Sequence, residues 1–146
     1  MALHAMGKLA ERQVEEAQRR WAVLAKECAA ARRKLNLLRQ YGDSYRAQLE
    51  DGGRQGVVAS QAASVAAFIR RVADVVAREE AQVRQLEGAC EREWADLVVA
   101  RRNKRMIEIL VERQMLREAE EALRRSQSEI DDLIARAGIF TRESRA

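Results

Sequence analysis

The chain has 146 residues, of which 34% are charged, 4% are aromatic and none is proline. Apolar residues make up 47% of it, but much of that is alanine, so large core side chains are few. This composition argues against an all-β or α/β domain. It is typical of long helices, because alanine, glutamate, arginine and leucine cost little in a helix interior. Charges of both signs mixed with regular apolar positions also argue against a disordered chain.

The net charge of +4 is mildly basic, unlike the concentrated positive stripe of a dedicated nucleic-acid binder. Cys28 and Cys90 have no CxxC spacing and His4 is the single histidine, so we expect no metal and no cofactor. No stretch approaches the ~20 apolar residues of a membrane span. We therefore expect a cytoplasmic protein with no direct membrane insertion and no nucleic-acid partner.

The first part of the chain carries a coiled-coil pattern. Apolar residues and glycines alternate in steps of four and three, which predicts a helix over about 3–50. These positions are Leu3, Gly7, Ala10, Val14, Ala17, Trp21, Leu24, Cys28, Ala31, Leu35, Leu38, Gly42, Tyr45 and Leu49. The glycine-rich segment that follows, Asp51 to Gly56, predicts a turn over 51–57.

A second apolar pattern predicts a helix over about 58–137, with Gly138 as its C-cap and a frayed tail over 138–146. The sequence thus predicts an all-α single domain over 1–146, in which two long, unequal helices form an antiparallel coiled-coil hairpin. If Leu49 faces Val58, then Gly42 lies near Val65 and Leu3 lies opposite Lys104. In this register Cys28 and Cys90 are too far apart to form a disulfide.

The same register leaves the second helix without a partner from about Arg105 to Ala137. Large apolar residues continue through this overhang, among them Ile107, Val111 and Met115. An apolar stripe with no partner in its own chain predicts one in another protein. The alternatives are a turn that lies elsewhere, or a tail that is partly disordered without a partner.

No catalytic constellation is present, and a two-helix coiled coil lacks the concave pocket of an enzyme. The densest basic cluster comprises Arg101, Arg102, Lys104 and Arg105. It fits contact with an acidic partner surface, contact with phosphates, or a solvated break in the seam. The aromatic residues Tyr41, Tyr45 and Phe68 fit either packing near the turn or a docking face beside Phe68.

Several of these features resemble the FliJ family, a coiled-coil component of the flagellar type III protein export apparatus. The matching residues are Tyr41-x-x-x-Tyr45 followed by Leu49, the turn ending in Gly56-Val57, Phe68-Ile69 with Val72, Val75 and Val76, and Arg113-Gln114. The resemblance covers nearly the whole chain. It implies a non-enzymatic stalk, similar to the central shaft of rotary ATP synthases, that acts in bacterial flagellum biogenesis, motility and chemotaxis.

The resemblance also implies partners. They are the hexameric export ATPase, the cytoplasmic domain of the membrane export gate and, in addition, export chaperones. The stalk would promote ATPase assembly and activity, and would work peripherally at the cytoplasmic face of the inner membrane. Gate contacts would fall on Phe68, Val72, Val75 and Glu79. Contacts with the ATPase ring would fall on Arg101, Arg102, Lys104, Arg105, Ile107, Val111 and Met115.

Three alternatives remain open at the level of sequence. The first is the equivalent stalk of a virulence-type III secretion system. The second is a basic coiled coil that binds nucleic acid, for which steeply salt-dependent DNA binding would be diagnostic. The third is a homodimeric structural coiled coil in which two overhangs pair.

Overall fold

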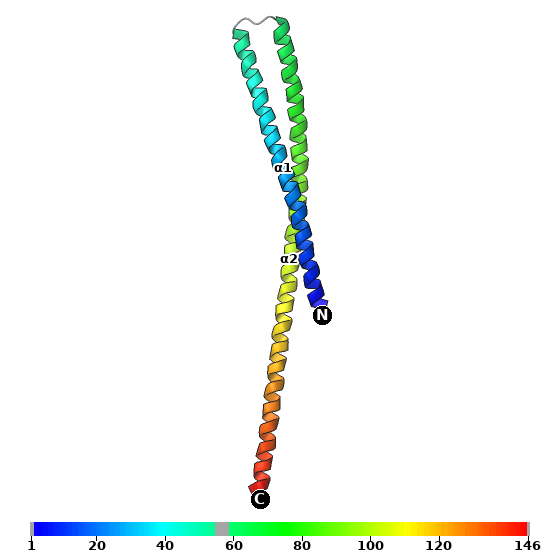
Figure 1. Cartoon of the computed structure of the whole chain (residues 1–146), viewed down its shortest axis with the longest axis vertical. Helices are drawn as coiled ribbons and strands as arrows, with labels where there is room; N and C mark the ends of the chain where they lie inside the picture. The colour runs from blue at the N-terminus through cyan, green and yellow to red at the C-terminus, as the bar shows by residue number, and fades with distance from the viewer. Residues whose placement is uncertain (1, 55–58, 146) are drawn as a thin grey trace. The chain divides into compact units, whose positions relative to one another are not determined.

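The computed structural model describes residues 2–54 and 59–145, and the side chains of residues 2–52 and 61–139. It contains two α-helices, α1 (Ala2–Arg54) and α2 (Ala59–Arg145). No strand occurs within these described ranges. The predicted fold class, an all-α hairpin of two long and unequal helices, is confirmed (Figure 1).

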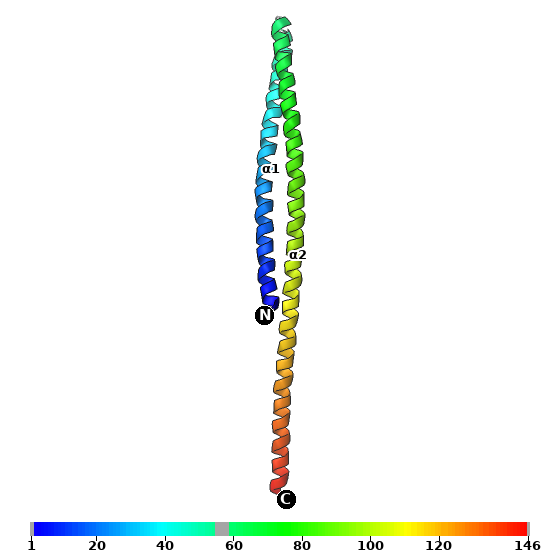
Figure 2. The ribbon, with the colours of Figure 1, turned by 90° about the vertical axis from the view of Figure 1, so that its right-hand side faces the viewer.

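The chain divides into two compact units. The hairpin unit comprises Gln13–Ala100, and the terminal unit combines the beginning of α1, up to Arg12, with α2 from Arg101 onwards. In the hairpin unit α1 and α2 lie side by side in antiparallel orientation, as Figures 1 and 2 show. Its buried apolar side chains on α1 belong to the predicted coiled-coil pattern: Ala17, Cys28 and Leu35. Those on α2 are Val83, Leu97 and Ala100. The seam is narrow because small residues fill much of it.

The two helices meet one heptad away from the expected register. Gly42 lies against Val72 instead of Val65, and in the terminal unit Gly7 lies against Ile107. A shift of seven residues returns the same heptad positions to the seam. For this reason, periodicity alone does not distinguish the two registers.

The cause of the shift lies at the end of α1. The expected glycine turn over 51–57 is wrong at its start, since α1 continues through Gly52 and Gly53 to Arg54, beyond the predicted end near residue 50. Residues 55–58 lie outside the described part. Glycine in a helix interior costs only about 1 kcal/mol relative to alanine, which favourable packing nearby can offset. When the point at which the chain folds back moves by one residue, the α2 residue that faces a given α1 residue changes by two positions.

The other end of α2 also differs from expectation. Gly138 does not end the helix, because α2 continues to Arg145 where a frayed tail over 138–146 was expected. In the terminal unit, α1 lines a groove with α2 residues from Lys104 to Glu118. The segment without α1 beside it therefore begins near Ala119, not near Arg105. We call residues 119–145 the α2 extension; at 1.5 Å per residue it is about 40 Å long.

Candidate functional site

An aromatic cluster joins the two helices near the turn. The ring centroids of Tyr45 and Phe68 are 4.7 Å apart, and those of Tyr41 and Tyr45 are 4.9 Å apart. The Tyr41 hydroxyl donates a hydrogen bond to the Tyr45 hydroxyl at 3.3 Å. This bond raises the pKa of Tyr41, because an ionised Tyr41 could no longer donate. The packing interpretation of these aromatic residues is confirmed, with Phe68 half-buried against Tyr45.

The expected gate residues differ in how much surface they offer. Phe68 and Val72 are half-buried, and Val72 lies against Gly42 in the seam. Glu79 is also half-buried and forms an ion pair with Lys34 at 3.0 Å. Val75 is exposed, with 40% of its surface accessible. Of these four residues, Val75 is therefore the one whose apolar side chain can contact another protein without rearrangement of the hairpin.

Ion pairs flank the seam on both sides of the hairpin unit. Four cations of α1 pair with glutamates of α2: Arg20 with Glu93 at 3.1 Å, Arg32 with Glu87 at 2.9 Å, Lys34 with Glu79 at 3.0 Å, and Arg39 with Glu80 at 3.0 Å. The hydrogen bond to Glu87, with the attraction of nearby negative charge, raises the pKa of Arg32. Exposed pairs of this kind contribute about 0–1 kcal/mol each. Their main consequence is to favour this register over its neighbours.

A groove in the middle of the hairpin unit brings the two tryptophans and the two cysteines together. Trp21 and Trp94 have ring centroids 5.1 Å apart and planes tilted by 56°. Cys28 and Cys90 line the same groove, and both are free thiols. The expectation that they form no disulfide agrees with the free thiols, although the shift of one heptad brings both cysteines to one groove. The coiled-coil pattern predicts Trp21 as a seam residue, but it does not indicate its contact with Trp94.

The basic cluster lies where the terminal unit begins. Arg101 and Arg102 are exposed, whereas Lys104 is half-buried beside the groove of this unit. Arg105 forms ion pairs along its own helix with Glu108 at 3.4 Å and Glu112 at 3.7 Å. These residues thus do not form one uniform positive surface. Arg102 is exposed on α2 and is available to an acidic partner.

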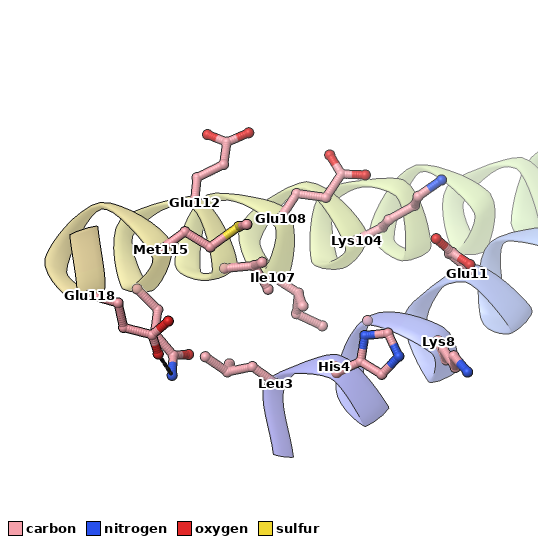
Figure 3. Close-up of a pocket in the computed structure, with 13 residues that line it drawn as sticks. Leu3, His4, Lys8, Glu11, Lys104, Ile107, Glu108, Glu112, Met115 and Glu118 are labelled. Carbon is pink, nitrogen blue, oxygen red and sulfur yellow. Dashed lines mark hydrogen bonds between the residues drawn. The ribbon is translucent and has the colours of Figure 1, made fainter. Parts of the chain in front are cut away.

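The groove of the terminal unit, about 560 Å³ in volume, has an apolar floor. Leu3 of α1 faces Ile107 across it, while Glu108 and Glu112 point away from α1 (Figure 3). Ile107 and Val111 are half-buried here, whereas Met115 is 64% exposed. Among the apolar residues expected to contact an ATPase ring, Ile107 and Val111 are therefore partly covered by this protein's own α1, and Met115 is largely free.

The α2 extension, together with the residues just before it, carries a second apolar stripe. Its large side chains are between 54% and 69% exposed: Leu116, Leu123, Ile130 and Ile134. Leu116 follows Val111 by five residues, so it points roughly 140° away from the side of α2 that lines the groove. The stripe is therefore a separate face of the helix and not a continuation of the contact with α1. A stripe of this regularity is typical of a helix that packs against a partner.

Two further observations concern chemistry and membranes. In the described part of the chain, no group of three or more His, Cys, Asp or Glu side chains could hold a metal ion. Among the described helices, neither has a stretch both long and apolar enough to cross a bilayer.

Comparison with known proteins identifies one family. The family model described as "Flagellar FliJ protein" matches residues 2–143. Searches of curated proteins and of solved structures found no match. The match extends across both helices and both compact units.

Proposed function

This chain belongs to the FliJ family of flagellar proteins, whose function lies in flagellar protein export, and from that premise we propose that it acts as a stalk and adaptor. Its α2 extension enters the ring of the hexameric export ATPase, and the region around Val75 binds the cytoplasmic domain of the export gate. The protein performs no chemistry of its own. It works at the cytoplasmic face of the inner membrane by holding these components together.

The observation that carries the proposal is the exposed apolar stripe of the α2 extension. Leu123 and Ile130 are 69% and 54% exposed, in a segment that has no α1 residue beside it. Burying a leucine or isoleucine side chain contributes about 1.5–3 kcal/mol. A partner that covers the stripe gains binding free energy by burying these side chains, which stay exposed in the isolated chain. Charged residues beside the stripe favour contacts that form and break readily, as a ring with changing subunit conformations requires.

Contacts from the basic cluster complement the stripe in this proposal. Arg101 and Arg102 are exposed on α2, and they suit acidic side chains on the ring. Met115 adds apolar surface to the groove that Lys104, Ile107 and Val111 also line. Arg105 pairs with Glu108 and Glu112 along α2. Because Ile107 and Val111 are half-buried, their contribution is to hold α1 against α2 in the segment that precedes the extension.

The export ATPase purified with and without this protein provides the test. We expect Leu123→Asp combined with Ile130→Asp to abolish stimulation of ATP hydrolysis, because both changes place charge on the apolar stripe. Ser128→Asp combined with Ala135→Asp is the matched control, since it adds the same charge to the opposite side of the extension. Equal stimulation by the two double variants, at unchanged helix content, would rule out the stripe as the ATPase contact.

A further inference from the structure

The outer face of α1 carries a second regular pattern. Within the hairpin unit, six residues follow one another in alternating steps of four and three, and cationic and apolar side chains alternate along them. They are Arg19, Val23, Lys26, Ala30, Arg33 and Leu37. We call this set the outer stripe. It spans about 27 Å of helix at 1.5 Å per residue.

The outer stripe lies on the side of α1 that faces away from α2. Lys26 precedes the buried seam residue Cys28 by two positions, and Arg33 precedes the buried Leu35 by two, which places each ~200° around the helix from its seam neighbour. All six side chains are exposed. Val23 and Leu37 are 58% and 66% exposed, so packing of α1 against α2 does not bury these apolar side chains.

The charged side chains of the outer stripe also form no ion pairs with the described residues of α2. The cations at the edges of the seam, such as Arg20 and Arg32, form ion pairs with α2. Within the described residues, Arg19, Lys26 and Arg33 have no carboxylate partner. The hairpin thus satisfies one set of α1 cations and leaves another set, aligned at heptad spacing, available to a partner.

We propose that the outer stripe docks a helix of a partner protein whose facing side alternates acidic and apolar residues. Steps of four and three are the spacing at which one helix follows another along a seam. Cations seven residues apart, about 10.5 Å, meet carboxylates that recur with the same spacing. Ala30, between Lys26 and Arg33, permits a close approach at the centre, while Val23 and Leu37 provide apolar contact towards either end.

The alternation favours a helix over other anionic partners. A phosphate backbone would pair with Arg19, Lys26 and Arg33 but would leave Val23 and Leu37 in water. A membrane surface requires a broad apolar sector with cations at its borders, whereas here the two kinds of side chain share one line. The inference does not depend on the proposed function, because the outer stripe lies on α1, whereas the proposed contacts with the ATPase and the gate lie on α2.

The test uses the full-length chain and a synthetic, fluorescently labelled helical peptide of about three heptads, with alternating leucine and glutamate along one face. We expect saturable binding that weakens by about tenfold or more when Arg19→Gln, Lys26→Gln and Arg33→Gln are combined, since three charge-assisted contacts are lost. Val23→Ser combined with Leu37→Ser should weaken it as well, because the apolar contacts are lost.

The matched control combines Arg20→Gln, Arg32→Gln and Lys34→Gln, which removes the same net charge from residues that pair with α2. We expect this variant to bind the peptide as the unaltered chain does, once circular dichroism shows an intact hairpin. Equal loss in both triple variants would overturn the proposal, because it would show general attraction between opposite charges. Absence of peptide binding would overturn it too, as would binding of duplex DNA or of phosphatidylserine vesicles in preference to the peptide.

Discussion

Gly42 of α1 and Val72 of α2 approach each other so closely that a Cβ atom on Gly42 would lie 3.3 Å from Cγ1 of Val72. The contact lies next to that between the tilted rings of Tyr45 and Phe68, so a residue without a side chain adjoins bulky aromatic rings. Gly42 therefore helps to set both the distance between the helices near the turn and the register in which they meet.

Substitution of Gly42 by a large residue should destabilise the hairpin. We expect Gly42→Leu to lower the free energy of unfolding by about 1–3 kcal/mol, because the added side chain overpacks the seam. Gly88→Ala is the control: its Cβ would meet only Nη1 of Arg92 at 3.5 Å, and the helix should gain about 0.5–1 kcal/mol. Urea unfolding followed by circular dichroism measures both. A Gly42→Leu chain as stable as the original would show that this contact does not fix the helix spacing.

Val75 provides the test of the gate contact. We expect Val75→Glu to weaken binding to the cytoplasmic domain of the export gate and to reduce motility, because a charge would replace the exposed apolar side chain. Ala77→Glu adds the same charge to an exposed position on another side of α2 and should have little effect. Calorimetry with the purified gate domain measures the binding. Equal affinity of the two variants would remove Val75 from the gate surface.

The hydroxyl pair of Tyr41 and Tyr45 predicts a pH dependence. Its hydrogen bond raises the pKa of Tyr41 above the usual value of about 10.0. The stability it contributes is therefore fully present below the ordinary tyrosine pKa, and it is lost as the pH rises through the raised pKa. In a Tyr45→Phe chain the pKa of Tyr41 should fall towards its ordinary value. Carbon-13 NMR of labelled tyrosine measures it residue by residue, and an unchanged Tyr41 pKa would contradict the assignment.

The two thiols should differ in reactivity although they line one groove. Cys28 is only 4% exposed, whereas Cys90 is half-buried. A maleimide should therefore label Cys90 in the native protein about tenfold faster than Cys28, which must wait for local opening of the hairpin. Mass spectrometry of the labelled peptides measures both rates, and denaturant should make them equal. Equal rates in the native state would place Cys28 outside the seam.

The heptad pattern of α1 was sufficient to predict the hairpin, because Ala17, Cys28 and Leu35 fall on one side of a helix in any register. It was not sufficient to predict which residues meet. Gly52 and Gly53 are strong turn residues locally, yet α1 continues through them, since the free energy of the whole seam outweighs their preference. A one-heptad shift also leaves the pattern unchanged, so Val65 and Val72 were equivalent partners for Gly42.

The candidate sites depended on the same register. The ion pair of Glu79 with Lys34 and the partial burial of Ile107 follow from which residue of α1 lies opposite each of them. Sequence periodicity does not show how far α1 is displaced along α2, and therefore does not show which residues lie opposite one another. The exposed stripe through Leu123 and Ile130 was accessible to sequence reasoning, because it requires only that α2 be much longer than α1.

Site-specific photocrosslinking tests the central claim, that the α2 extension binds the export ATPase through its apolar stripe. A photoreactive phenylalanine derivative would be placed at Leu123 or, on the opposite side of the helix, at Ser128, and the chain irradiated with the assembled ATPase ring. The account predicts a strong crosslink to the ATPase from position 123 and little from position 128. Crosslinks of equal yield from both positions, or none from position 123, would contradict it.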